Sequence, residues 1–129
     1  MMKRVLVIED EEDIGEALQQ LLAEEGYETT CAMTLAEGFA AVVAFEPACI
    51  ILDLNLPDGC SETLLASLAR EDRALPTILL SAAFDAQRVA SRFGIPHIRK
   101  PFEFEALAAA IATAIANWEG PLRHAREIA

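Results

Sequence analysis

Hydrophobic residues follow two different periods along this chain. Short runs that are apolar at every position predict buried parallel strands, and stretches with apolar residues three or four positions apart predict amphipathic helices. The expected strands cover residues 5–8, 27–32, 48–52, 77–80 and 95–99. The expected helices begin near residue 14, after Thr34 as N-cap, at residue 60 or 61, near residue 85 and at residue 103.

Glycine and proline mark where these elements end. Gly26 and Gly94 are typical of helix C-termini, Pro47 ends the second helix, and residues 57–59 predict a turn. The last helix is expected to run to about Trp118. Strand and helix then alternate five times with short connections. This order predicts an α/β fold, (βα)5, with a doubly wound parallel five-stranded sheet. Residues 27–32 are less apolar and suit an edge, whereas residues 48–52 suit the centre.

Composition narrows the range of partners. The chain has 129 residues, 53% of them hydrophobic, and its 10 basic and 21 acidic residues give a formal net charge of −11. A field of that sign repels phosphate backbones and anionic lipids, so we expect no direct nucleic-acid or membrane binding. It attracts a divalent cation or a partner with a basic docking face. The apolar runs are too short for a signal-peptide core or a membrane span, which predicts a cytoplasmic protein.

The three cysteines have no metal-binding or disulfide spacing. Cys31 and Cys49 lie in strand-like runs, and Cys60 lies where the third helix is expected to begin. We expect Cys31 and Cys49 to be small buried hydrophobic residues in a reducing compartment.

Polar residues follow four of the five expected strands. Glu9 and Asp10 come after the first strand, Asp53 after the third, Ser81 after the fourth and Lys100 after the fifth. The carboxyl ends of parallel strands meet at one edge of the sheet, where ligands usually bind. Three neighbouring carboxylates repel one another unless a cation lies between them, and oxygen ligands without histidine or thiolate suit Mg²⁺, or Mn²⁺.

This grouping suggests a reaction. A rigidly held Asp53 carboxylate can attack a phosphoryl group, while the metal and Lys100 neutralise charge on its oxygens and Ser81 donates a hydrogen bond. Each residue also has a simpler explanation. The acidic run 9–13 is also typical of a solvated helix start, Asp53 of turn chemistry and Lys100 of a surface charge, and Ser81 alone is uninformative. The joint pattern across four strands favours the reactive site.

Four segments carry a family resemblance, in the right order and at the right intervals. Residues 5–12, 52–59, 77–82 and 100–102 (VLVIEDEE, LDLNLPDG, TILLSA and KPF) are similar to the receiver domains of bacterial response regulators. The resemblance covers the chain to about Trp118. It implies a CheY-like, flavodoxin-like sheet with strand order 2-1-3-4-5 and a receiver domain over residues 1–118. Residues 119–129 are then a C-terminal tail or the start of a linker.

The resemblance also implies roles for individual residues. Asp53 is the phospho-acceptor, supplied by a histidine kinase or a histidine phosphotransfer protein. Asp10, Asp53 and the main-chain carbonyl of Asn55 bind Mg²⁺ directly, and Glu9 acts through metal-bound water. The Ser81 hydroxyl moves with the phosphoryl group and so shifts the loop that carries it. The only chemistry expected is the domain's own phosphorylation and dephosphorylation.

Further implications concern the fourth and fifth strands and the residues that follow them. Lys100 matches the lysine of the family and precedes a cis peptide bond to Pro101. The switch position, usually tyrosine or phenylalanine, is His97. It is either a switch whose burial depends on pH or a histidine that merely lies at the edge of a strand. Ala83 offers no polar group to orient an attacking water. The fourth helix, fifth strand and fifth helix form the face expected to dimerise or to contact a downstream target or output domain.

The sequence argues against three rival functions. A haloacid dehalogenase-type phosphatase needs a second acid two residues after its nucleophile, where this chain has Asn55. A nucleotide-binding flavodoxin-like module needs a phosphate-binding loop after the first strand, where residues 9–13 have the wrong charge. A degenerate receiver that serves only for docking needs none of Asp10, Asp53, Ser81 and Lys100.

Overall fold

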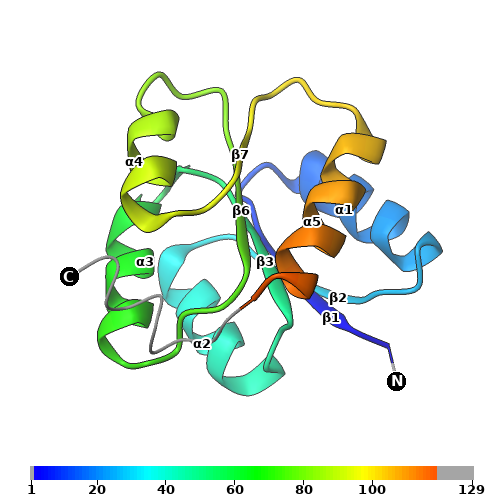
Figure 1. Ribbon diagram of the computed structural model, residues 1–129, viewed down its shortest axis with the longest axis horizontal. Helices are drawn as coiled ribbons and strands as arrows, with labels where there is room; N and C mark the ends of the chain where they lie inside the picture. Colours follow the sequence, from blue (N-terminus) through cyan, green and yellow to red (C-terminus); the bar gives the residue numbers. More distant parts are fainter. Residues whose placement is uncertain (1, 119–129) are drawn as a thin grey trace.

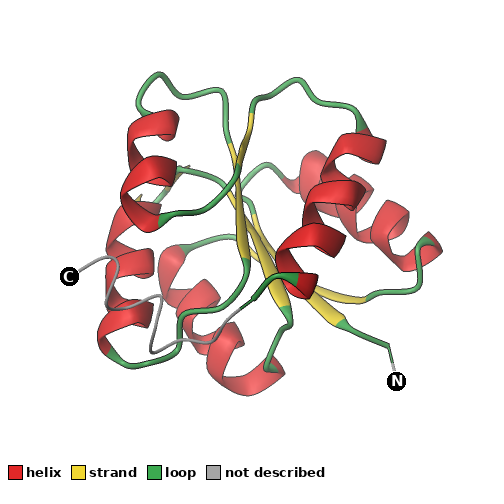
Figure 2. Cartoon of the chain, in the orientation of Figure 1, coloured by secondary structure: helices red, strands yellow, loops and turns green. Residues whose placement is uncertain are grey.

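A five-stranded parallel sheet runs through the centre of the protein in a computed structural model, which describes residues 2–118 (Figures 1 and 2). Its strand order is β2-β1-β3-β6-β7, which is the predicted order 2-1-3-4-5. All four strand pairs are parallel. The strands are β1 (Arg4–Ile8), β2 (Glu28–Ala32), β3 (Cys49–Leu52), β6 (Thr77–Leu80) and β7 (His97–Ile98).

Helices cover both faces of this sheet. Two helices, α1 (Glu12–Glu24) and α5 (Phe104–Ala116), lie on one face. Three helices lie on the other face: α2 (Leu35–Phe45), α3 (Ser61–Arg70) and α4 (Ala86–Phe93). The doubly wound α/β prediction is therefore confirmed.

The continuous apolar strands arise because both faces are buried. Along β1, Val5 and Val7 pack into the core beneath α1 and α5, whereas Leu6 and Ile8 pack into the core beneath α2, α3 and α4. All four are fully buried. Successive side chains of a strand point to opposite faces, so a strand between two helical layers needs apolar residues at every position.

Most predicted element ends agree with the structure. Thr34 is the N-cap of α2, and its hydroxyl accepts a hydrogen bond from the main-chain N–H of Glu37 at 3.1 Å. Gly94 ends α4 in the left-handed conformation, with φ of 65°. β2 is an edge strand, as predicted. The fifth strand is shorter than the predicted 95–99, because Pro96 has no N–H to donate and the chain leaves the sheet after Ile98.

Two further expectations need correction. Residues 57–59, where only a turn was expected, belong to an antiparallel hairpin formed by β4 (Asn55–Leu56) and β5 (Gly59–Cys60), with residues 57 and 58 at its tip. Cys49 is buried, which raises the pKa of its thiol to about 12, but Cys31 is only partly buried because β2 has no neighbour on its outer side. All three cysteines are free.

No helix within residues 2–118 is long and apolar enough to cross a membrane. The predicted tail, residues 119–129, lies outside the described part of the chain.

Candidate metal and phosphorylation site

Three carboxylates meet at the carboxyl edge of the sheet. Glu9 and Asp10 directly follow β1 and Asp53 directly follows β3, and β1 and β3 are hydrogen-bonded neighbours. One oxygen from each of the three side chains lies within 4.8 Å of the others. The structure therefore brings together all three carboxylates that the sequence assigned to a metal site.

Glu9 is the most deeply placed of the three, with 2% of its surface exposed. Its Oε1 accepts a hydrogen bond from the main-chain N–H of Glu11 at 3.2 Å, and its Oε2 accepts one from Lys100 Nζ at 3.0 Å. Burial raises the pKa of Glu9, and the nearby Asp53 charge adds to this rise, while the Lys100 hydrogen bond opposes it. The Lys100 hydrogen bond is thus the main contact that favours the charged form of this carboxylate.

The Asp53 side chain is fixed by contacts on both oxygens. Its Oδ1 accepts a hydrogen bond from the main-chain N–H of Leu54 at 2.8 Å, and its Oδ2 lies 3.4 Å from Lys100 Nζ. Its own main-chain N–H donates to the Ile8 carbonyl at 3.0 Å, which continues the sheet to the position of the carboxylate. Only 14% of the side chain is exposed, so Asp53 is held in one orientation while part of it faces solvent.

Lys100 bridges two of the carboxylates. Burial alone would lower the pKa of this lysine, but the hydrogen bonds and charges of Glu9 and Asp53 outweigh burial and raise it. Lys100 therefore stays protonated at neutral pH. Its peptide bond to Pro101 is cis, as the family resemblance implied.

The donor set matches a hard divalent cation. Three carboxylates supply oxygen ligands, and the described residues offer no histidine or thiolate in this cluster. A buried carboxylate, Glu9, lies behind two that are partly exposed, Asp10 and Asp53. Such a set, open on one side, suits Mg²⁺ or Mn²⁺, which keep several water ligands.

Ser81 lies at the end of β6, the strand next to β3. The side chain is buried, and its Oγ accepts a hydrogen bond from the main-chain N–H of Ala83 at 3.0 Å. The Ser81 hydroxyl is thus anchored to the loop that it was predicted to move. Ala83 contributes a main-chain donor here.

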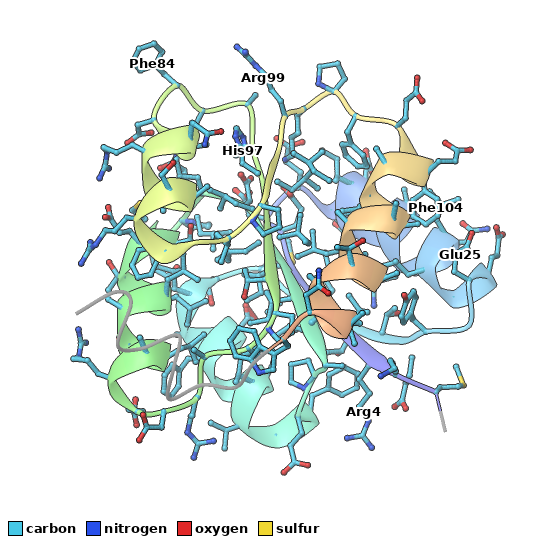
Figure 3. The ribbon with its side chains drawn as sticks, viewed as in Figure 1. Arg4, Glu25, Phe84, His97, Arg99 and Phe104 are labelled. Carbon is cyan, nitrogen blue, oxygen red and sulfur yellow. The ribbon has the colours of Figure 1, made fainter. Side chains whose placement is uncertain are left out.

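His97 contacts the main chain of Ser81. Its Nε2 lies 3.1 Å from the Ser81 carbonyl oxygen, and its Nδ1 lies 3.4 Å from Oε1 of Gln87 on α4. The carbonyl can only accept, so Nε2 carries a proton. His97 therefore links the end of β6 to α4. Figure 3 shows it beside α4, with Phe84 projecting outward from the β6–α4 loop.

The role expected of Asn55 stays a prediction. Asn55 lies in β4, two residues after Asp53, and its side chain is exposed. One contact was not expected from sequence: Asp58, predicted only as part of a turn, accepts hydrogen bonds from the main-chain N–H groups of Leu35 and Ala36. Its partners lie more than 20 residues away, so no local sequence signal points to them.

Comparison with known proteins identifies the family. The sequence-family model described as the response regulator receiver domain matches residues 5–112. The chain belongs to this family. Receiver domains are the phosphorylated modules of response regulators in two-component systems, and aspartate phosphorylation and Mg²⁺ are characteristic of them. The family match favours neither the phosphatase nor the docking-only alternative.

Individual relatives agree with this assignment. The chain is 33% identical over 114 residues to the uncharacterized transcriptional regulatory protein YkoG of Bacillus subtilis, covering 86% of this chain and 50% of YkoG. It is 33% identical over 117 residues to the KDP operon transcriptional regulatory protein KdpE of Escherichia coli, covering 88% and 52%. The chain thus spans about half the length of the curated relatives it matches.

A solved structure supports the fold and the metal chemistry of the family. The response regulator TrrA of Thermotoga maritima, in complex with Mg²⁺ and BeF, superimposes with a TM-score of 0.79 and is 27% identical, covering 88% of this chain and 99% of TrrA.

Proposed function

We propose that this receiver domain accepts a phosphoryl group on Asp53 from the phosphohistidine of a histidine kinase or histidine phosphotransfer protein. One observation carries the proposal: Lys100 Nζ lies 3.0 Å from Glu9 and 3.4 Å from Asp53, within a cluster of three carboxylates that fits Mg²⁺. Asp10, Asp53 and the Asn55 carbonyl would hold the ion, with Glu9 acting through a water ligand. The ion, when bound, would supply positive charge to the phosphoryl oxygens.

In the proposed transfer, each residue of the site has a separate role. A carboxylate oxygen of Asp53 forms a bond to phosphorus while the bond from phosphorus to the histidine nitrogen breaks. The imidazole of the donor keeps the released electron pair and takes a proton from solvent. The Leu54 N–H restricts rotation of the Asp53 carboxylate, which favours in-line attack. The Lys100 ammonium neutralises charge on the transferred group, and the Ser81 hydroxyl is expected to move toward it.

An apolar groove suggests where the protein donor docks. The groove, of about 560 Å³, is bordered by Leu21 of α1 and by Phe102, and it extends to Lys100. One side of the groove is formed by α1, which contains Glu12, Asp13, Glu16 and Glu24 and no basic residue. This combination suits a donor helix with an apolar face and basic flanks. Leu21→Asp should slow transfer from the protein donor and leave phosphorylation by acetyl phosphate unchanged.

The phosphorylated domain would act through the face formed by α4, β7 and α5. Phosphorylation adds about one negative charge at Asp53. A resulting movement of the Ser81 carbonyl can reach Gln87 on α4 through His97, which contacts both. Phe84 is fully exposed at the edge of this face and is available for contact with a second copy, a target or an output domain. We place this activity in the cytoplasm, where free thiols persist and histidine kinases supply phosphoryl groups. Catalysis would be limited to self-phosphorylation and self-dephosphorylation.

Mass spectrometry of the intact protein tests the central step. After incubation with acetyl phosphate and Mg²⁺, the wild-type mass should rise by one phosphoryl group, and Asp53→Asn should abolish the gain. Asp13→Asn, which removes an exposed carboxylate of α1, should leave it unchanged. No gain in the wild type, or an equal gain in Asp53→Asn, would show that the proposal is wrong.

A further inference from the structure

The β4–β5 hairpin is attached to the N-terminus of α2 by one side chain. Oδ1 of Asp58 accepts a hydrogen bond from the main-chain N–H of Leu35 at 2.7 Å, and its Oδ2 accepts one from Ala36 at 3.1 Å. Both carboxylate oxygens are thus used on one target. Asp58 lies at the tip of the hairpin that follows the proposed phospho-acceptor.

This attachment completes the capping of α2. The first N–H groups of a helix have no partners within the helix. Thr34 accepts from the N–H of Glu37, and Asp58 accepts from the two N–H groups that precede it. A carboxylate at this end also interacts favourably with the helix dipole. Thr34 caps α2 from its own chain segment, whereas Asp58 caps it from a hairpin more than 20 residues away.

Packing holds the hairpin in the same place. Gly59 has a φ of 142°, and a Cβ added there would lie 3.3 Å from Cδ1 of Leu35. Leu56 is buried in the core that Leu35 also contacts. The hairpin therefore lies directly on the first turn of α2, with the Asp58 carboxylate as its polar contact.

The same hairpin carries Asn55. In the antiparallel register Asn55 pairs with Cys60 and Leu56 pairs with Gly59. At the base of the hairpin, the end away from Asp58, the Ser61 N–H donates to the Leu54 carbonyl at 2.7 Å. The main chain from Asp53 to Ser61 is thus fixed at its base by this bond and at its tip by Asp58. Between them lie only two residue pairs.

We propose that Asp58 is a positioning residue for the metal site: by fixing the hairpin on α2, it holds the main-chain carbonyl of Asn55 where the ion can use it. The proposal rests on the proposed function, because it assumes that Mg²⁺ binds at Asp10, Asp53 and Asn55. Residues that orient the ligands of a metal typically change its affinity 10–100-fold when they are removed. Asp58 acts on a main-chain ligand, which no substitution of Asn55 itself can remove.

Calorimetric Mg²⁺ titration of the full chain separates this role from simple helix capping. Asp58→Ala should weaken Mg²⁺ binding about tenfold. Thr34→Ala is the matched control, because it removes a cap from the same helix end without touching the hairpin. It should lower the melting temperature as Asp58→Ala does and change the Mg²⁺ affinity less than twofold. Asp58→Asn keeps the side-chain shape and one acceptor, so its Mg²⁺ affinity should fall between those of the wild type and Asp58→Ala.

The possible outcomes are distinct. If the wild type binds Mg²⁺ and both Asp58 variants bind it equally well, the positioning role is wrong and the proposed function stands. Equal weakening by Thr34→Ala and Asp58→Ala would also overturn the positioning role, since it would trace the effect to α2 alone. If the wild type takes up no Mg²⁺, the proposed function fails and this inference fails with it. Should Asp58→Ala not fold, Asp58→Asn carries the test, and unchanged affinity there would count against the role.

Discussion

The ammonium group of Lys100 lies 3.0 Å from the Glu9 carboxylate, although the two residues are 91 positions apart in the chain. Glu9 is 2% exposed and Lys100 is 17% exposed, so water screens this ion pair only weakly. A buried carboxylate of this kind depends on its partner, because an unpaired charge away from water is costly.

Replacing Lys100 should therefore destabilise the metal-free protein. We expect Lys100→Met to lower the free energy of unfolding by about 2 kcal/mol, less than for a fully buried pair because Lys100 retains some contact with water. Urea unfolding at neutral pH in the presence of a chelator would measure this. Lys3→Met, at an exposed position before β1, is the control and should have little effect. A stability equal to that of the wild type would mean that Glu9 does not need the ammonium group.

Removing one of the three carboxylates should have the opposite effect on stability. Asp10→Asn should raise the free energy of unfolding of the metal-free protein by about 1 kcal/mol, because it relieves repulsion from Glu9 and Asp53. Its melting temperature should rise accordingly. The same change should weaken Mg²⁺ binding at least tenfold. Thermal melts with and without Mg²⁺ test both statements: the ion should stabilise the wild type much more than the variant. A variant that is less stable without metal would contradict the repulsion argument.

Asp58 should make part of the stability depend on pH. The main-chain N–H of Leu35, assisted by that of Ala36, holds the pKa of this carboxyl below its ordinary value. A carboxyl whose pKa is lower in the folded state contributes stability above its unfolded pKa, and this contribution disappears as the pH falls through the folded pKa.

The comparison of wild type with Asp58→Asn isolates that contribution. The difference between their urea midpoints should be constant from pH 7 to about pH 5 and should shrink below about pH 4. In Thr34→Ala the lost cap is a hydroxyl group that does not titrate, so its difference from the wild type should not change over the same range. A gap for Asp58→Asn that stays constant down to pH 3 would contradict the assigned hydrogen bonds.

His97 should report the state of the phosphorylation site. Because its Nε2 contacts the Ser81 carbonyl, a movement of that loop must change the environment of the imidazole. We expect the ring resonances of His97 to shift when Mg²⁺ and beryllofluoride are added, and the shift to be smaller in Ser81→Ala. Nuclear magnetic resonance of protein labelled at histidine would show this. Unchanged resonances in the wild type would exclude His97 as the switch residue.

Sequence patterns predicted the sheet and the meeting of its charged residues at one edge, because both depend on features repeated along the chain. Apolar runs such as that of β1 identify strands with two buried faces, and the strand order brings Glu9, Asp53 and Lys100 to one edge. The short β7 was less predictable, because its limit depends on Pro96 and on where the chain leaves the sheet.

Two contacts between distant segments, those of Asp58 and of His97, were not predictable. The Pro-Asp-Gly sequence at residues 57–59 predicts a turn, but nothing near Asp58 indicates that its carboxylate caps α2. The contact of His97 with Gln87 likewise depends on how α4 packs beside β7. Such pairs arise from tertiary packing, which the local periodicity of a sequence does not encode.

The long separation between Glu9 and Lys100 has a consequence for assembly. A chain synthesised from its N-terminus presents every carboxylate of the site before its ammonium group, because Glu9, Asp10 and Asp53 all precede Lys100. A fragment ending at Gly94 would contain all three acids but not Lys100, the ammonium group that contacts Glu9 and Asp53. The charge of these carboxylates is thus neutralised only when Lys100, which follows the final strand, has been added. An incomplete chain would depend on dissolved cations instead.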